Sequence, residues 1–171
     1  MRIRALSICL LLLTVSCSAD DATAACDAEG GFGTAAASAP TPSDPFPQGC
    51  VVLEGADGES FLRVQLAEDD EQRQIGLMGR EDLPEDAGML FVFEEEVQGA
   101  FWMKDTLIPL SIAYIGSDGE IVDIKDMQPC EADPCDVYPS DAPYIQALEV
   151  NLGAFEAMGI TEGDTVRLVQ K

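Results

Sequence analysis

One stretch of the chain, residues 101–110, combines aromatic, basic and acidic side chains in a way that packing alone seldom requires. It contains the only tryptophan, Trp102, followed closely by Lys104 and Asp105. A tryptophan ring offers the flat apolar face found in sugar- and cation-binding sites. A lysine ammonium can hold a carboxylate or phosphate group, and an aspartate can act as a general acid or base. This stretch is therefore the first candidate for a functional site.

Two further charged residues belong with this candidate. Arg80 and Lys104 each adjoin an apolar strand, where an unpaired charge would be costly, so each must be paired or face a ligand. Asp105 and Glu149 are the nearest acids by strand position. We predict that Arg80, Trp102, Lys104, Asp105 and Glu149 meet around one concave ligand-binding site. The structural alternatives are a Lys104–Asp105 pair at a strand end, a buried Arg80–Glu149 pair and a Trp102 ring that fills the core.

Strand geometry makes this prediction more specific. Neighbouring side chains of a strand point to opposite faces, so Trp102 and Lys104 should share one side while Met103 and Asp105 take the other. A tryptophan–lysine pair on one face fits either a ligand platform or a lysine stem packed on a ring.

The cysteines indicate an oxidising compartment. Cys130 and Cys135 are separated by four residues, a loop that a disulfide can close, and Cys26 and Cys50 would then form a second bridge. Neither spacing resembles a zinc site or a Cys-x-x-Cys redox motif. Because the chain has no histidine, we expect no metal site, and nothing in the sequence indicates a cofactor.

The charge balance excludes several classes of partner. The chain has 32 acidic and 9 basic residues, a formal net charge of −23. This argues against nucleic acid and against docking on anionic lipid. The acids lack the spacing of a calcium loop, and we interpret them mainly as a solvated acidic surface.

The N-terminus predicts export. Residues 1–16 carry two arginines and then an apolar run that is too short to span a bilayer, as in a signal peptide. Small residues before Cys17 resemble a bacterial lipoprotein processing site, at which Cys17 would receive a lipid. The alternative is an ordinary secretory signal that is cleaved near Ala19 or Ala25. We expect a protein in the periplasm or on the outer face of a membrane, attached only through the lipid at Cys17.

The remaining chain divides into a tether and one domain. Residues 17–49 are rich in Ala, Gly, Ser and Pro and predict a disordered tether. Residues 50–171 are long enough for a single compact domain. Apolar runs and alternation predict strands, a Gly-Ser-Asp-Gly turn at 116–119 predicts a hairpin, and two segments predict helices. The expected strands are 51–53, 60–66, 89–93, 100–104, 110–115, 120–127, 144–150 and 164–169; the expected helices are 68–78 and 154–158; and 128–143 should be a long loop.

This pattern predicts a mainly β (α+β) domain, with about seven short strands in an antiparallel sandwich or half-open barrel and two short helices. Three segments, Arg73–Arg80, Gly88–Phe93 and Phe101–Leu110, together with the hairpin, resemble the domain of unknown function 192 family. The resemblance covers about residues 60–169. It implies a small exported or anchored, mainly β domain with no established reaction. The family often has Asn where Asp105 stands, so amide donation cannot be essential there.

The sequence favours a binding domain over an enzyme. It lacks histidine, a G-x-S-x-G motif and a phosphate loop, so an enzyme would depend on carboxylates alone. We expect a monomer that contacts a small polar molecule, a glycan or an envelope protein. One alternative is a hydrolase that uses Asp105 and Glu149. The other is a thiol–disulfide protein that uses Cys130 and Cys135.

The predicted anchor is testable in cells. Cys17→Ser should move the protein from the membrane fraction to the soluble fraction, because the lipid supplies the only predicted attachment. Fractionation and N-terminal sequencing measure this, and a Cys9→Ser variant controls for loss of a thiol. A mature N-terminus at Asp20 or later would show that the signal is simply cleaved.

Overall fold

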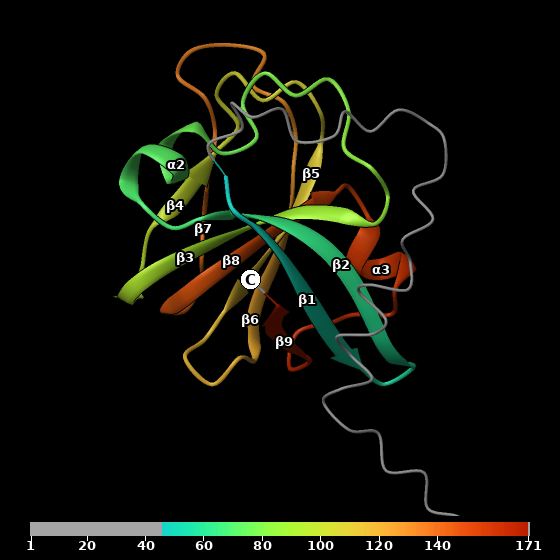
Figure 1. Ribbon diagram of the computed structural model, residues 1–171. Coiled ribbons are helices and arrows are strands. Elements are labelled where there is room, and N and C mark those ends of the chain that lie inside the picture. The colour runs from blue at the N-terminus through green and yellow to red at the C-terminus, as the bar shows by residue number, and fades with distance from the viewer. Residues whose placement is uncertain (1–45, 171) are drawn as a thin grey trace, which may run out of the picture.

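The computed structural model describes residues 46–170, which contain nine strands and two short helices (Figure 1). The elements in chain order are β1 (Gln48–Gly55), β2 (Gly58–Ala67), α2 (Asp70–Ile75), β3 (Ala87–Val97), β4 (Ala100–Trp102), β5 (Leu110–Ile115), β6 (Ile121–Met127), β7 (Val137–Pro139), β8 (Tyr144–Asn151), α3 (Ala154–Ala157) and β9 (Thr165–Gln170). Within these residues, no helix has the length and apolar composition needed to cross a membrane.

Seven strands form one sheet in the order β6-β5-β8-β3-β2-β1-β9, and β4 pairs with β7 in a second, two-stranded sheet. The predicted mainly β architecture is confirmed, and it is consistent with a β sandwich. The large sheet is mixed, because β2 and β3 run parallel while its other neighbouring strands are antiparallel. The chain between these two parallel strands, residues 68–86, carries α2.

The two edges of the large sheet approach each other at one end. Glu120, just before β6, forms a bridge with Thr165 at the start of β9. Ile121 donates its backbone N–H to Asp164 at 2.8 Å, and Val166 donates to Gly119 at 2.8 Å. The described sheet therefore curls strongly without closing into a barrel.

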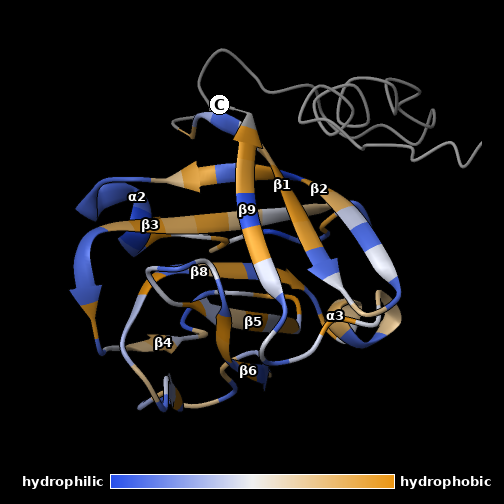
Figure 2. Cartoon of the chain, turned by 90° about the horizontal axis from the view of Figure 1, so that it is seen from below, coloured by the Kyte–Doolittle hydropathy of each residue, from blue (hydrophilic) through white to orange (hydrophobic). Residues whose placement is uncertain are grey.

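Apolar side chains form a core on each face of the curled sheet. Leu90 belongs to one cluster, whereas its neighbours Met89 and Phe91 belong to the other, as strand alternation requires. Figure 2 shows β3, β5 and β8 as largely hydrophobic and α2 as hydrophilic. Consistent with this, α2 has no buried residue. The helix is therefore a surface element rather than a cover for the core.

The small sheet packs on the second cluster through aromatic contacts. Phe101 of β4 lies with its ring centroid 4.9 Å from Phe91 and 5.8 Å from Tyr114. Tyr114 donates its hydroxyl hydrogen to the carbonyl of Tyr138, the residue opposite Phe101 in β7, at 2.5 Å. These contacts fix β4, and with it the position of Trp102, against the large sheet.

The helix α2 is shorter than the sequence predicted. Asp69 and Gln72 form a capping box at its start, so its beginning is well defined. It ends at Ile75 because Gly76 takes a φ of 48°, which leaves the helical region. The prediction of a helix over 68–78 is therefore wrong at both ends. The predicted hairpin at 116–119 is confirmed by hydrogen bonds across the turn.

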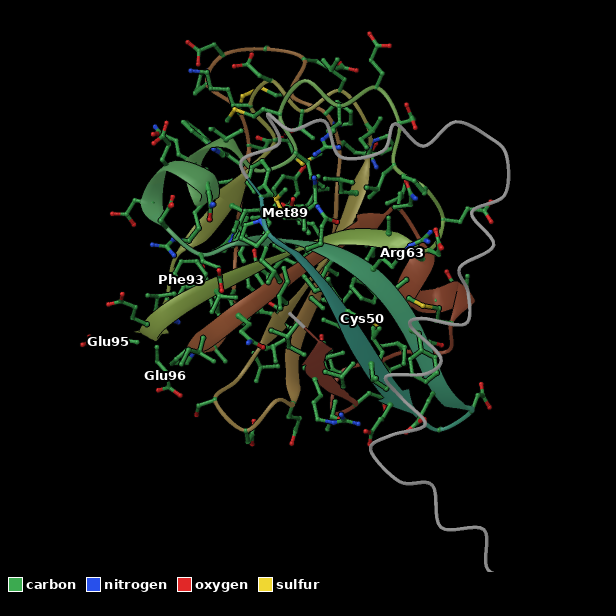
Figure 3. The ribbon with its side chains drawn as sticks, in the orientation of Figure 1. Cys50, Arg63, Met89, Phe93, Glu95 and Glu96 are labelled. Atoms are coloured by element: carbon green, nitrogen blue, oxygen red, sulfur yellow. A yellow bond between two sulfur atoms is a disulfide. The ribbon has the colours of Figure 1, made fainter. Side chains whose placement is uncertain are left out.

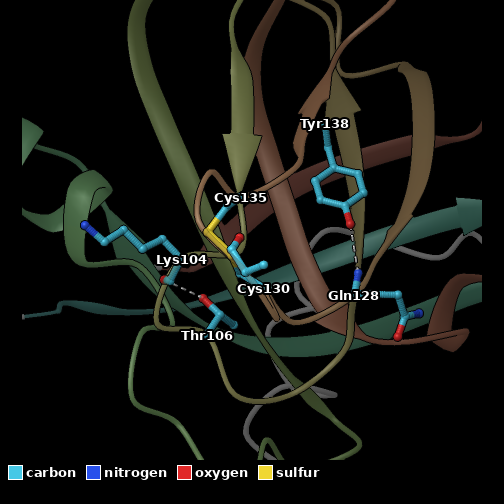
Figure 4. Close-up of a disulfide and its surroundings, with 7 residues drawn as sticks. Lys104, Thr106, Gln128, Cys130, Cys135 and Tyr138 are labelled. Carbon is cyan, nitrogen blue, oxygen red and sulfur yellow. Dashed lines mark hydrogen bonds between the residues drawn. A yellow bond between two sulfur atoms is a disulfide. The ribbon is translucent and has the colours of Figure 1, made fainter.

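The predicted bridge between Cys130 and Cys135 is present, in the loop before β7 (Figure 4). Figure 4 shows it between the turn that holds Lys104 and Thr106 and the Tyr138 side chain. Cys50 is buried, but its predicted partner Cys26 lies outside the described residues, as do Cys17 and the signal segment, so those predictions stay untested.

Removing this bridge should destabilise the domain without unfolding it. Closing so short a loop stabilises by about 2 kcal/mol in the chain-entropy model. Cys130→Ser with Cys135→Ser should therefore lower the melting temperature measured by circular dichroism. The native protein with this bridge reduced serves as the control, because it loses the bridge without any change of side chain. Equal melting temperatures for the double variant and the native protein would contradict a stabilising role.

Candidate functional site

A hollow of about 340 Å³ lies between α2 and the segment that follows β4, and it contains three of the five predicted site residues. Trp102, Lys104 and Asp105 form one wall. The other wall comes from α2 and the turn after it. This volume is at the lower end of the range of about 300–1,000 Å³ for small-molecule sites. The lining residues are Glu71, Gln74, Ile75, Met78, Trp102, Lys104 and Asp105.

Trp102 and Lys104 share the outer face, as predicted, but Asp105 does not take the side of Met103: it lines the same hollow. The predicted strand over 100–104 ends at Trp102, so the alternation does not extend to Asp105. The tryptophan side chain is 46% exposed, while Met103 between them is only 2% exposed. The Lys104 Nζ atom lies 5.5 Å from the centroid of the Trp102 ring, within range of a cation–π interaction. Trp102 therefore does not fill the core. It is a half-exposed ring with an ammonium group placed over it.

Asp105 occupies a backbone conformation that few residues accept. Its φ of 54° makes it the only non-glycine residue of the described chain in the left-handed region. Aspartate and asparagine enter this region more readily than other residues that carry a Cβ atom, because their short polar side chains can hydrogen-bond locally. This explains in physical terms why Asp or Asn suits this position. Asp105 and Lys104 are adjacent in the chain but do not form the ion pair considered as an alternative.

The two walls of the hollow are joined through the main chain. Gly79, in the turn after α2, donates its N–H to the carbonyl of Asp105 at 2.8 Å. Thr106 donates its N–H to Met103 at 3.2 Å and its hydroxyl to Lys104 at 3.4 Å, a contact visible in Figure 4. The same figure shows the Lys104 side chain extending away from the disulfide. Main-chain hydrogen bonds therefore hold the two walls of the hollow in place relative to each other.

Arg80 and Glu149 do not line this hollow. Arg80 donates from its guanidinium to the side-chain oxygen of Gln65 in β2. Gln65 is opposite Met89, and Met89 is opposite Glu149, so the three side chains share one face of the large sheet. Arg80 therefore bonds to a residue in the same row across the strands as Glu149, but no ion pair joins the two. The predicted residues fall into a surface group and a sheet-face group.

Glu149 is an unusual residue for the interior. It is 4% exposed and lies between Met89 and Ile112 on the neighbouring strands, and within residues 46–170 its carboxyl makes no hydrogen bond. Burial alone raises the pKa of its carboxyl from 4.5 to about 8. The side chain is therefore protonated and neutral in the folded protein at pH 7, which is how it tolerates its apolar surroundings.

The residues of α2 were missed by sequence reasoning. Ile75 and Met78 fall in the predicted helix 68–78 and were not singled out as candidate site residues, but Ile75 is 39% exposed and both line the hollow. Glu71 and Gln74 carried no signal beyond helical composition. The helix was predicted, but its position opposite Trp102 depends on contacts between segments distant in the sequence, such as the hydrogen bond from Gly79 to Asp105.

Of the other hollows in residues 46–170, two lie beside the disulfide loop and beside α2. One, of about 450 Å³, lies beside the disulfide loop and is lined in part by Met103, Glu131 and Asp136. The other, of about 630 Å³, is acidic and lies between the start of α2 and the outer end of β3, where Figure 3 places Phe93, Glu95 and Glu96. Within residues 46–170, no group of side chains has an arrangement suited to a metal ion.

The acidic hollow is organised around an arginine that is already satisfied. Arg73 donates to the carbonyl groups of Glu68 and Val92, each at 2.7 Å, and to Asp70 at 2.6 Å. Its guanidinium also lies 5.1 Å from the centre of the Phe93 ring. These contacts fasten α2 to β3, so Arg73 has a structural role.

Comparison with known proteins identifies the family. The family model DUF192, described as "Uncharacterized ACR", matches residues 52–168. The chain belongs to the domain of unknown function 192 family. The resemblance inferred from the sequence is thereby confirmed. A search of the curated proteins finds no match.

Two crystal structures share the fold of this family member. One, from Sinorhizobium meliloti and named as a candidate transcription regulator, is 35% identical, with a TM-score of 0.67 over 72% of this chain and 95% of that one. The other, a protein of unknown function from Novosphingobium aromaticivorans, is 30% identical, with a TM-score of 0.69 over 75% of this chain and 91% of that one.

The raised pKa of Glu149 predicts a specific pH dependence of stability. The folded protein keeps a proton that the unfolded chain releases above pH 4.5. The contribution of Glu149 to the free energy of unfolding is therefore highest below pH 4.5, and it falls as the pH rises to about 8. Glu149→Gln, which stays neutral, should remove this loss and be more stable than the native protein above pH 8, by about 3–5 kcal/mol at most.

Urea unfolding between pH 4 and 9 measures the effect. The exposed acid Glu162 provides a matched control, because Glu162→Gln changes the net charge equally without changing a buried carboxyl. If the difference between Glu149→Gln and the native protein stays constant across this pH range, the carboxyl is not titrating as inferred.

Proposed function

We propose that this protein is an exported, lipid-anchored binding domain that captures a small polar ligand in the hollow between α2 and β4. The observation that carries the proposal is the half-exposed Trp102 ring beneath the Lys104 ammonium, in a hollow of small-molecule size. An aromatic ring with a few fixed polar groups beside it is the usual lining of a small-molecule site.

The rigidity of the hollow supports binding. β4 is held by its pairing with β7 and by the packing of Phe101. Asp105 is kept in a left-handed conformation, and its carbonyl is hydrogen-bonded to Gly79. Backbone strain of this kind persists only where the surroundings enforce it, and it concentrates at functional sites. A preformed site also binds at a lower entropic cost.

The enzymatic alternatives receive less support from the geometry. A carboxylate hydrolase needs Asp105 and Glu149 on opposite sides of one cleft, yet Glu149 is buried on a sheet face outside the hollow. A redox role would use the separate hollow of about 450 Å³ that Cys130 lines, but acidic and no basic side chains line it, whereas reactive cysteines lie in electropositive surroundings. Binding therefore remains the best-supported function.

The regulator name attached to one related structure does not transfer to this chain. A nucleic-acid-binding surface requires clustered positive charge, whereas this chain has a formal net charge of −23. The proposed location outside the cytoplasm is supported by the signal-like N-terminus and by the Cys130–Cys135 disulfide.

The single tryptophan makes the proposal directly testable. Because Trp102 is the only tryptophan, intrinsic fluorescence excited at its absorption edge reports on the hollow alone. We expect saturable changes in its emission, together with a rise in melting temperature, for at least one compound in a panel of sugars, amino acids, nucleotides and short peptides.

Truncation of the ring tests the location of the site. Trp102→Ala should abolish the ligand-induced rise in melting temperature while the domain stays folded. Leu152→Ala, which shortens another exposed apolar side chain outside the hollow, should preserve it. An undiminished thermal shift in Trp102→Ala would place binding elsewhere.

A further inference from the structure

The pairing of charges across the domain singles out Lys104. Residues 46–170 contain six basic side chains, and four of them form ion pairs with carboxylates. Arg80 is bonded to the amide of Gln65 instead, and Lys104 lies over the Trp102 ring. The four paired residues are Arg63, Arg73, Lys125 and Arg167.

The absence of an ion pair at Lys104 is notable because acids are close by. The chain carries 32 acidic residues, and Glu71 and Asp105 line the same hollow as Lys104. Neither carboxylate pairs with the ammonium, and neither makes a side-chain hydrogen bond within the described residues. The hollow therefore presents one positive and two negative groups that are held apart from one another.

The rest of the lining is mainly apolar. Trp102 on one wall and Ile75 and Met78 on the other form an apolar wall surface, and Gln74 adds one amide. A volume of about 340 Å³ suits one compact molecule rather than an oligosaccharide chain or the surface of a folded protein. The ligand must then carry an apolar group and polar groups within a few bond lengths of each other.

Charge complementarity discriminates among ligands of this size. A purely anionic molecule would face the carboxylates of Glu71 and Asp105. A purely cationic molecule would have to bind the face of the Trp102 ring, but the Lys104 ammonium already lies over this ring and would repel it. A neutral sugar could hydrogen-bond to these groups through its hydroxyls, but it would give none of the three charges an opposite charge. A molecule that carries both signs of charge pairs each of them with its opposite.

We infer that the hollow binds a zwitterion of the amino-acid class with an apolar side chain. This inference rests on the proposed function and names its ligand. The ligand carboxylate pairs with the Lys104 ammonium, the ligand ammonium lies between Glu71 and Asp105, and the apolar side chain packs on Trp102 and Ile75. The two ion pairs set the orientation, and the apolar wall sets the preference among side chains.

The test removes each charge of the ligand in turn and, separately, the protein side chain that should pair with that charge. The twenty protein amino acids are first compared by thermal shift with the intact domain. The strongest is then titrated by calorimetry in four forms: free, as its amide, as its N-acetyl derivative and as its N-acetyl amide. We expect the free amino acid to bind best and each lost charge to weaken binding about tenfold or more.

The protein variants show which group meets which charge. Lys104→Met should lose affinity for the free amino acid and the N-acetyl form, but not for the amide, which has no carboxylate. Asp105→Asn, which suits the same left-handed backbone, should lose affinity for the free amino acid and the amide, but not for the N-acetyl form. Arg167→Met, on β9 and outside the hollow, controls for the change in net charge.

The outcomes separate this inference from the proposed function. If sugars or nucleotides perturb Trp102 emission while no amino acid binds, the hollow is a binding site and the zwitterion inference is overturned. Equal affinity for all four ligand forms would overturn it as well. If no compound in any class perturbs Trp102 emission or raises the melting temperature, the proposed function falls too.

Discussion

The arrangement of the site depends on the parallel pairing of β2 and β3. Parallel neighbours cannot be joined by a tight turn, so the chain must cross back over the end of the sheet. The register from Arg63–Ala87 to Ala67–Phe91 fixes where this crossover starts and stops. Residues 68–86 make the crossing, and they carry both α2 and Arg80. An antiparallel hairpin at this point would leave Trp102 without an opposing wall and without a hollow.

The crossover is pinned to the sheet at separate points, which makes it a firm wall. Arg80 bonds to Gln65, and Asn151 donates its amide hydrogens to the carbonyl groups of Leu83 at 2.9 Å and Pro84 at 3.2 Å. The neutral carboxyl of Glu149 lies on the same sheet face as Gln65 and Asn151, so this face is polar at its margin and apolar at its centre. The surface group and the sheet-face group are thus linked through one loop.

Patterns of neighbouring residues correctly predicted the structural features that depend only on local geometry. The period of two placed Trp102 and Lys104 on one face, and a short spacing identified the Cys130–Cys135 bridge. Strand direction is not local, so the parallel pair was not foreseen. The partner of Arg80 was missed because an uncharged glutamine gives no signal of such pairing in the sequence. The wall formed by α2 was missed because the position of this helix opposite Trp102 depends on contacts between segments distant in the sequence.

The pairing of β1 with β9 has a consequence for how the protein acquires its structure during synthesis. Residues near 50 hydrogen-bond with residues near 170, so the first strand of the sheet has no neighbour on one side until the last strand has been made. Contacts between such distant segments form slowly, because a long loop must close first. A nascent chain released without its final strand would expose the backbone edge of β1, which is a template for intermolecular pairing.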